Sequence, residues 1–207
     1  MPTAFEDIHT IPLTNVKAFI LACGESLALV DTGRSEEDAK KILEYIRSLN
    51  RSPRDVEICL ITHRHRDHIG GLSKLKKECG FKVASHRGDA SDIEEITGIS
   101  VDVLLDDGQI LQYCGGTKVV HVPGHTSGNI CLFLMTKGAI IAGDTLFILN
   151  GELSPPPDRY CEDPEMAKRG LRRLLKLDFD ALLVSHGDDI LENGRAELKR
   201  LLDELGY

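Results

Sequence analysis

The sequence contains no apolar stretch long enough to span a membrane, and it has no excess of basic residues. Its 33 acidic residues outnumber the 25 basic ones, which gives a net charge of −8. This balance disfavours a protein that binds nucleic-acid backbones through a basic face. The first seven residues have neither the basic residues nor the apolar run of a signal peptide. We therefore expect a cytoplasmic protein that binds neither membranes nor nucleic acid.

The sequence also lacks C-x-x-C pairs, internal repeats and low-complexity segments. Its six cysteines are widely spaced, at Cys23, Cys59, Cys79, Cys114, Cys131 and Cys161. Without a secretory signal, this pattern favours reduced thiols over disulfides. Hydrophobic residues make up 42% and charged residues 28%, as in an ordinary globular protein. A chain of this length predicts one domain covering residues 1–207.

Hydrophobic patterning predicts short strands interspersed with amphipathic helices. Strands are expected over residues 16–22, 26–30, 56–61, 81–84, 118–122, 130–135, 139–142 and 181–185, with another after a turn at 106–108. Helices are expected over residues 36–49, 71–79, 89–96, 165–177 and 193–205. Ser35 is the predicted cap of the first helix, and the proline-containing residues 150–163 predict a loop. Hairpin-linked strands separated by helices predict mixed sheets that helices cover.

Residues 62–71 contain three imidazoles and a carboxylate close together. In an extended segment the side chains of His63, His65 and Asp67 project to one side and can face a common point. His68 faces elsewhere unless the segment turns, which the two following glycines would make easy. These donors can bind one divalent metal or share two. The alternative is a solvated loop that carries histidines.

Three later residues of metal-binding type also follow predicted strands. His125 comes after residues 118–122, Asp144 after 139–142, and His186 after 181–185. Ligands in α/β proteins gather beyond strand ends, so these residues and the histidine stretch are candidates for one common edge. A glycine stands beside each of the three, where it permits close backbone approach or simply makes a turn. Individually, each residue is more often a cap or turn residue.

Taken together, these residues resemble the motifs of the metallo-β-lactamase-fold hydrolases. The similarity consists of His63-x-His65-x-Asp67-His68, then Gly124-His125, Gly143-Asp144 and His186, in that order. The preceding residues 29–33 (LVDTG) resemble a short motif that comes before the histidines in that family. The resemblance implies the fold class α/β: a four-layer αββα sandwich of two mixed β-sheets flanked by helices. It also implies a two-metal site at one edge.

The resemblance assigns the ligands as His63, His65 and His125 for the first metal, Asp67, His68 and His186 for the second, and Asp144 for both. Asp31 would support the site without binding metal, and a plain turn role is its alternative. Nitrogen and oxygen donors of this kind suit Zn²⁺, with iron or manganese as alternatives. To serve both metals, the segment must turn between His65 and His68.

Two metals about 3.5–4 Å apart can clamp a hydroxide and polarise a carbonyl or phosphoryl oxygen. Metal binding lowers the pKa of water to about 7, so neither a serine nor a cysteine nucleophile is needed. Asp67 is the candidate catalytic residue, because its carboxylate can orient the nucleophile and relay a proton. This chemistry describes a metal-dependent hydrolase with a small-molecule substrate.

The segments at residues 123–128 (PGHTSG) and 143–147 (GDTLF) are similar to those of glyoxalase II, or hydroxyacylglutathione hydrolase. A thioester, a related ester or a lactone is therefore the expected substrate. Glyoxalase II enzymes continue into a C-terminal helical domain that contacts glutathione, whereas this chain ends soon after His186. Residues 148–152 also lack the family's glycine- and arginine-containing continuation. Recognition of glutathione is left open.

Two other functions remain as alternatives: a persulfide dioxygenase-like oxidoreductase with one iron, and a metal-binding module without turnover. Phe147, Arg159 and Tyr160 are candidate substrate contacts, although a rigid connector is the alternative for residues 154–160. Phe147 stands where lactone hydrolases usually have a tyrosine. Arg64 and Arg66, in the variable positions of the histidine motif, are expected to be solvated, and attraction of an anionic substrate is their alternative role. A homodimer is one alternative for the oligomeric state.

Overall fold

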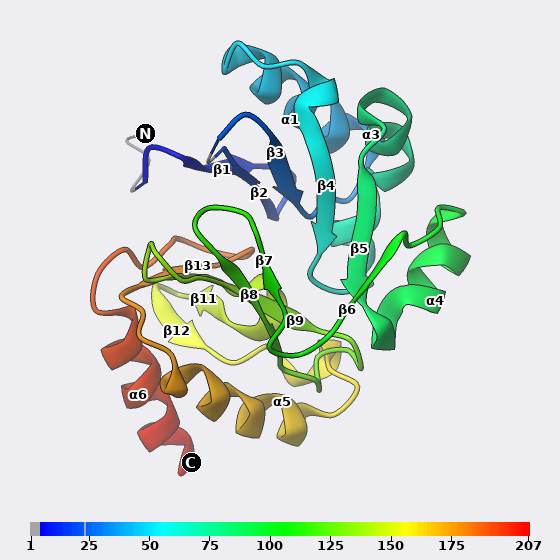
Figure 1. Ribbon diagram of the computed structural model, residues 1–207. Coiled ribbons are helices and arrows are strands. Elements are labelled where there is room, and N and C mark those ends of the chain that lie inside the picture. The colour runs from blue at the N-terminus through cyan, green and yellow to red at the C-terminus, as the bar shows by residue number, and fades with distance from the viewer. Residues whose placement is uncertain (1–4, 23) are drawn as a thin grey trace. The chain divides into compact units, whose positions relative to one another are not determined.

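Two mixed β-sheets, each with its own helices, and a small two-stranded sheet make up the described part of the protein (Figure 1). The computed structural model describes residues 5–22 and 24–207. The chain divides into unit 1, residues 1–105, and unit 2, residues 106–207. This α/β architecture of mixed sheets and covering helices is the one that the sequence predicts. That both units belong to one domain stays a prediction.

Unit 1 is built on a six-stranded sheet in the order β1-β2-β3-β4-β5-β6. The strands are β1 (Ile8–Pro12), β2 (Lys17–Leu21), β3 (Leu27–Val30), β4 (Val56–Ile61), β5 (Lys82–His86) and β6 (Val103–Leu105). β1, β2 and β3 pair antiparallel, whereas β3 to β6 pair parallel. The carboxyl ends of β3, β4 and β5 therefore lie at the same edge of the sheet.

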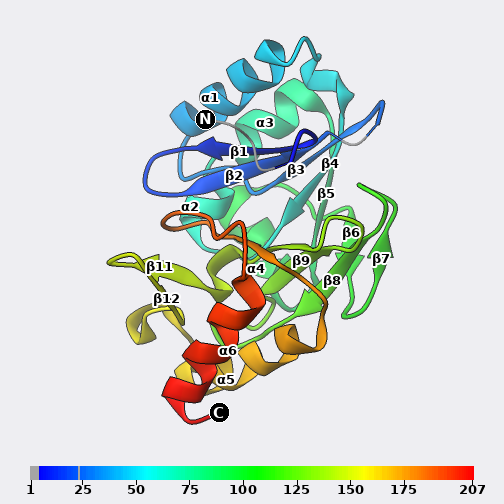
Figure 2. The ribbon, with the colours of Figure 1, turned by 90° about the vertical axis from the view of Figure 1, so that its left-hand side faces the viewer.

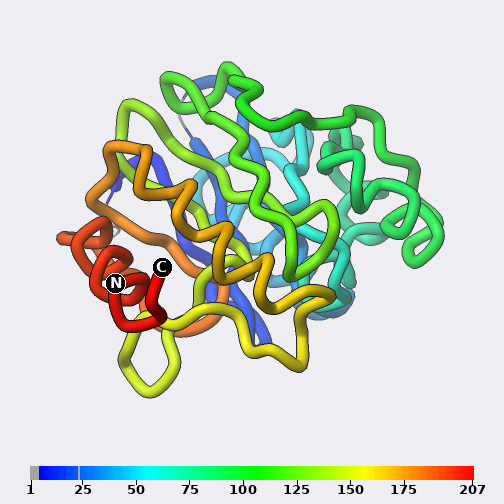
Figure 3. The backbone as a smooth tube through the Cα atoms, turned by 90° about the horizontal axis from the view of Figure 1, so that it is seen from below, coloured from blue at the N-terminus to red at the C-terminus, as the bar shows by residue number. Residues whose placement is uncertain are grey.

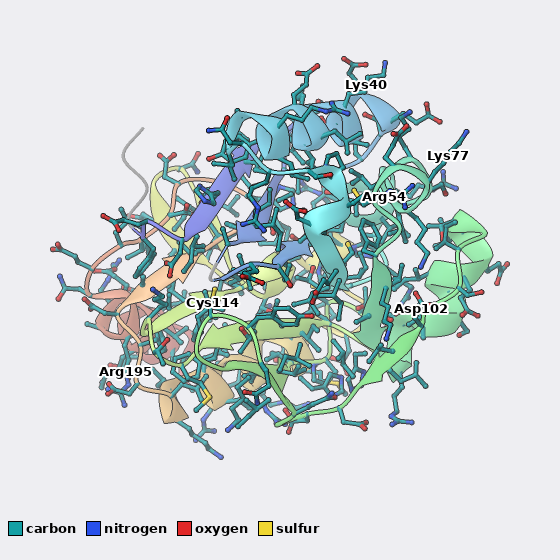
Figure 4. All side chains as sticks on the ribbon, turned by 45° about the horizontal axis from the view of Figure 1, so that its top comes forward. Lys40, Arg54, Lys77, Asp102, Cys114 and Arg195 are labelled. Atoms are coloured by element: carbon teal, nitrogen blue, oxygen red, sulfur yellow. The ribbon has the colours of Figure 1, made fainter. Side chains whose placement is uncertain are left out.

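The helices of unit 1 are α1 (Glu36–Ser48), α2 (Arg66–Ile69), α3 (Leu72–Cys79) and α4 (Arg87–Thr97). α1 and α3 lie on one face of the sheet (Figures 1 and 2), where Ile42 and Leu75 pack with strand residues such as Leu29. Their outer faces carry exposed charges such as Lys40 and Lys77, which point away from this core (Figure 4). The apolar stripe of each helix thus decides which side it buries.

Unit 2 is built on a five-stranded sheet in the order β13-β10-β9-β8-β7. The strands are β7 (Ile110–Leu111), β8 (Thr117–His121), β9 (Ile130–Leu134), β10 (Ala139–Ile141) and β13 (Ala181–Leu183). Pairing is antiparallel except between β10 and β13. Because β9 runs antiparallel to both β8 and β10, strands β8, β10 and β13 all run in one direction.

Unit 2 has the helices α5 (Pro164–Gly170) and α6 (Gly194–Leu205), and α6 lies beside the segment that directly follows α5 (Figure 3). Their buried residues, with a 3-10 segment at Leu171–Lys176, join the core that contains Ile140 and Leu182. Strands β11 (Phe147–Leu149) and β12 (Glu152–Ser154) form a separate hairpin that projects from this unit (Figures 2 and 3).

Most predicted elements are confirmed within a few residues, including the hydrogen bond from the Asp38 amide to the cap Ser35. Strand β1 has no counterpart in the predictions, since its middle residues are polar and Pro12 ends it. A proline is tolerated there because β1 is an edge strand. The helix expected over residues 165–177 instead changes to 3-10 geometry after Gly170, where a Cβ would lie 2.8 Å from Val122.

The expectation of a continuous loop over residues 150–163 is wrong, because strand β12 and a 3-10 turn at Asp158–Tyr160 lie within it. No helix among residues 5–22 and 24–207 has both the length and the apolar character needed to cross a bilayer.

Candidate metal centre

In unit 1 the parallel strands β3 and β4 place Asp31 and the histidine segment next to each other. Asp31 follows β3 in a left-handed conformation with φ of +61°. Its carboxylate accepts hydrogen bonds from the Thr62 amide and the Thr62 hydroxyl, both at 2.8 Å. Thr62 follows β4, so these bonds join the ends of two neighbouring strands. They lie at the edge of the sheet where the histidine segment begins with His63.

The histidine segment turns between His65 and His68, as the two-metal interpretation requires. His65 is the N-cap of the short helix α2, and the His68 amide donates to its carbonyl at 2.9 Å. The extended alternation expected for His63, His65 and Asp67 therefore ends at His65, because Asp67 is already helical. The ring of His63 lies 4.8 Å from that of His65 and 4.1 Å from that of His68, centroid to centroid.

His68 is held by Asp31. The Nδ1 atom of His68 lies 2.8 Å from Oδ2 of Asp31, and both side chains are fully buried. An imidazole whose Nδ1 donates to a carboxylate leaves Nε2 as the nitrogen that can bind a metal. The backbone is fixed as well, because the amide and hydroxyl of Thr32 both donate to the His68 carbonyl at 2.7 Å.

Gly70 and Gly71 serve close packing rather than a left-handed turn. Both have ordinary helical φ values, −65° and −89°. A Cβ on Gly70 would lie 2.1 Å from the Arg34 carbonyl oxygen, and one on Gly71 would lie 2.3 Å from that of Thr32. The segment after Asp31 thus contacts the end of the histidine segment backbone to backbone, which only glycine permits.

In unit 2 the three strands that run in one direction each lead to a candidate ligand. His125 follows β8, Asp144 lies in a 3-10 turn after β10, and His186 follows β13. The carboxyl ends of these strands share one edge of the sheet, so the three side chains meet there. In this unit each apolar strand is therefore followed by a residue of metal-binding type, as the sequence predicts.

Asp144 lies between two imidazoles. Its Oδ2 is 3.4 Å from Nε2 of His125, and its Oδ1 is 3.2 Å from Nε2 of His186. His125 and Asp144 are buried, whereas the His186 side chain is 20% exposed. A carboxylate that offers one oxygen towards each of two imidazoles has the donor arrangement of a bridging metal ligand.

Close backbone packing fixes the two histidines of unit 2. Gly124 has φ of +126°, and a Cβ there would lie 2.3 Å from the Ala167 amide of α5. Gly187 has φ of +97°, and a Cβ there would lie 2.5 Å from Cβ of Ile148. The glycines beside His125 and His186 are thus required both for conformation and for close approach.

A buried polar network holds the turn that carries Asp144. The side-chain Nδ2 of Asn129 donates to the Val122 carbonyl at 3.0 Å and to the Thr145 hydroxyl at 2.7 Å. The Cys131 thiol contacts the same hydroxyl at 3.1 Å. Asn129 was not among the predicted site residues, although it directly follows the PGHTSG motif. Only tertiary contact with Thr145 shows its role.

The three candidate substrate contacts differ in their surroundings. Phe147 is buried, and its ring stacks on that of His186 at 4.8 Å with an interplanar angle of 4°. Arg159 lies over the Tyr160 ring at 4.5 Å and donates to its hydroxyl at 3.1 Å. Tyr160 is 49% exposed, so Arg159 and Tyr160 contact each other on an exposed 3-10 turn. Their contact with substrate stays a prediction.

Arg64 is not a solvated residue, which corrects the expectation. Its guanidinium donates to the buried carboxylate of Asp89 at 3.0 Å and pairs with Asp92, also at 3.0 Å. The Arg64 amide donates to the same Asp89 carboxylate at 3.0 Å. This ion pair ties the histidine segment to helix α4. Neither acid had a recognisable signal in the sequence, because both read as residues of an ordinary amphipathic helix.

The thiols offer no alternative nucleophile among the buried residues. Burial raises the pKa of Cys131 to about 12 and that of Cys79 to about 11, so both are protonated at neutral pH. Cys59, Cys79, Cys131 and Cys161 are free, as expected. Cys114, labelled in Figure 4, is disulfide-bonded, so the expectation of a reduced thiol is wrong there. Cys23 lies outside the described residues.

Each unit therefore carries its own groups of metal-binding type. In unit 1 a ligand atom of His63 lies within 4.8 Å of one of His65, and the same holds for Asp67 and His68. In unit 2 the imidazoles of His125 and His186 lie beside the two oxygens of Asp144. The set consists of imidazole nitrogens and carboxylate oxygens, which fits a divalent transition metal.

A family comparison identifies the class of protein. The model of the metallo-β-lactamase superfamily matches residues 12–186, which is most of the chain. The chain belongs to this superfamily.

Solved structures show the same fold. A metallo-β-lactamase family protein from Thermus thermophilus superposes with a TM-score of 0.78 at 22% identity, covering 99% of this chain and 81% of that one. A Cronobacter sakazakii metallo-β-lactamase mutant gives a TM-score of 0.76 at 20% identity, covering 96% and 90%.

Several curated relatives are named hydroxyacylglutathione hydrolase. The protein from Pelagibacter ubique is 35% identical over 54% of this chain, and the match spans 44% of that protein. The protein from Pseudomonas syringae is 32% identical over 91% of this chain and 68% of its own length. A Drosophila melanogaster protein named beta-lactamase-like protein 2 homolog is 27% identical over 87% of this chain and 61% of its own length.

Proposed function

We propose that the chain is a metal-dependent hydrolase that cleaves a thioester, or a related ester or lactone, of a small molecule. The observation that carries this proposal is the carboxylate of Asp144, whose two oxygens face His125 and His186 separately. A side chain that only balanced charge would need one such contact. Two contacts, one to each oxygen, fit a carboxylate that is shared by two metals.

The protein would hold two divalent metals, for which we favour Zn²⁺ over iron or manganese. Unit 1 offers four candidates and unit 2 three, and the superfamily match spans both units. The proposed ligands are His63, His65, Asp67, His68, His125, Asp144 and His186. On this proposal residues 1–207 act as one catalytic domain.

When bound, the metals supply a nucleophilic hydroxide at neutral pH and polarise the scissile carbonyl. Asp31 fixes the orientation and tautomer of His68 through the contact to Nδ1. Asp67 is the proposed catalytic residue, because its side chain is 30% exposed whereas His63 and His68 are buried. An accessible carboxylate can orient the nucleophile and carry a proton to the leaving group.

The relatives named hydroxyacylglutathione hydrolase support a thioester as the substrate class. We propose a small-molecule substrate and no nucleic-acid or membrane partner, and both this and a cytoplasmic location stay predictions. Light scattering of the purified chain would decide between a monomer and the homodimer.

Elemental analysis of the purified protein, followed by assays on thioesters, lactones and phosphodiesters, tests the proposal. We expect two metals per chain and metal-dependent hydrolysis of a thioester, ester or lactone. The Asp144→Ala variant should lose metal and activity together, whereas Asp178→Asn, at an exposed position of the same unit, should retain both. Full metal and full activity in Asp144→Ala would overturn the two-metal site. One iron with oxygen uptake on a persulfide would instead identify a dioxygenase.

A further inference from the structure

We propose that the β11–β12 hairpin selects substrates with an apolar, uncharged acyl group. This inference rests on the proposed function and names the substrate class of that same site. The hairpin is a two-stranded sheet of its own, not paired with the five-stranded sheet. Its two-residue turn, Asn150-Gly151, has φ values of +54° and +84°. Positive φ at both turn residues defines a tight type I′ hairpin, so the tip is well fixed.

The hairpin is attached directly to a proposed metal ligand. The Ile148 amide donates to the His186 carbonyl at 3.0 Å, and the Phe147 ring stacks on the His186 imidazole. Close packing of Gly187 against Ile148 leaves no room for the hairpin to shift there. Any group held by His186 therefore lies beside the start of β11.

The pleat of the hairpin decides which of its residues face a group held by His186. Ile148 and its cross-strand partner Leu153 pack on the core of unit 2. Side chains alternate along a strand, so Phe147 and Leu149 share the opposite face, about 7 Å apart. Phe147 is buried, whereas Leu149 is 41% exposed. Leu149 is therefore the exposed apolar residue on the face of the hairpin whose buried member, Phe147, stacks on the His186 ring.

A lone exposed leucine needs no explanation, but this one continues a buried aromatic stack that touches a proposed ligand. The residue opposite Leu149 is Glu152, which is exposed on the same face. Its carboxylate would repel an acyl chain that ends in a negative charge. The face therefore fits a neutral alkyl chain and disfavours a dicarboxylic acyl group.

The test is hydrolysis by the full chain of thioesters of N-acetylcysteamine, a neutral thiol, with unbranched acyl groups from acetyl to octanoyl. We expect kcat/KM to rise with chain length, by up to about fourfold for each methylene that the hairpin buries. Leu149→Asn should flatten this dependence, whereas Leu191→Asn, which changes a leucine of 45% exposure in the same unit, should leave it unchanged. An equal dependence in all three proteins would overturn the role of the hairpin.

The charge is tested with glutaryl and pentanoyl thioesters, which have the same number of acyl carbons. Glu152→Gln should raise the glutaryl-to-pentanoyl ratio of kcat/KM several-fold, and Glu192→Gln, at another exposed position, should not. An unchanged ratio would overturn the discrimination against charge. Hydrolysis without chain-length dependence refutes this inference alone, whereas no hydrolysis of any ester refutes the proposed function and the inference with it.

Discussion

Oδ2 of Asp31 lies 2.8 Å from Nδ1 of His68, and neither side chain is exposed to solvent. The same carboxylate binds the amide and hydroxyl of Thr62. One aspartate after β3 therefore orients a proposed ligand and also joins the ends of β3 and β4. Because Oδ2 contacts His68 and also accepts the Thr62 hydroxyl, a substitution of Asp31 affects both functions, so metal affinity and the fold have to be measured side by side.

Replacing Asp31 by asparagine keeps the size of the side chain but removes its charge. We expect metal affinity to fall by about 10- to 100-fold, because the His68 ring loses the partner that fixes its tautomer. Competition with a chelator, followed by elemental analysis, measures this change, and circular dichroism verifies the fold. The matched control is Asp178→Asn, which should bind metal normally. Unaltered affinity in a folded Asp31→Asn protein would show that the contact serves stability alone.

Gly70→Ala should lower the free energy of unfolding by about 3 kcal/mol, since the new Cβ would meet the Arg34 carbonyl at 2.1 Å and backbone cannot rotate away. Urea denaturation measures the loss. Gly98→Ala is the comparison, because no atom lies within 4 Å there and only its φ of +69° opposes a side chain, at about 1 kcal/mol. Equal losses in both variants would refute the close-packing explanation.

Arg64→Ala should lower the free energy of unfolding by about 2–3 kcal/mol, because it leaves the Asp89 carboxylate buried without its guanidinium. This loss of stability is smaller than that expected for a fully buried ion pair, because the Arg64 side chain is 19% exposed. Arg66→Ala, at an exposed position, should change stability by less than about 0.5 kcal/mol. The ion-pair assignment requires an Arg64–Asp89 double-mutant cycle to show coupling, and additive losses would contradict it.

Stability towards acid should depend on Asp38, which is fully buried. Burial alone would raise the pKa of Asp38, but hydrogen bonds from Thr14, Arg34 and Lys41 outweigh it and lower the pKa below 3.8. A carboxyl with a lowered folded-state pKa stabilises the protein above its unfolded value, and this contribution is lost as the pH falls through the folded value.

Asp38→Asn should therefore be less stable than the parent protein at neutral pH, and the gap should narrow as the pH falls below 3.8. Urea denaturation over a pH series measures the gap. A gap that stays constant into acid would mean that the Asp38 charge makes no contribution. Asp178→Asn, which changes an exposed carboxylate, should show no such pH dependence.

Much of the fold could be read from local patterns because these patterns record burial. The apolar stripe over residues 36–49 produced α1, with Ser35 as its cap, and the apolar run over residues 56–61 became β4 with the same bounds. Strand β1 escaped because its central residues are polar and only its pairing with β2 shows it. The β11–β12 hairpin did carry a local signal, Asn150-Gly151 between apolar runs, which the neighbouring prolines obscured.

For the candidate site, too, some features could be predicted from the sequence and others only from the tertiary structure. By itself the sequence determined the residue types, their order after strands, and the turn between His65 and His68 that two metals require. Partners distant in the sequence were decided only by tertiary structure: Asp89 for Arg64, Asn129 for Thr145, and Phe147 for the His186 ring. The ability of a residue to bind a metal depends on the chemistry of its own side chain, so a sequence reveals it. The orientation of that side chain depends on contacts between segments, which form only once strand pairing has brought those segments together.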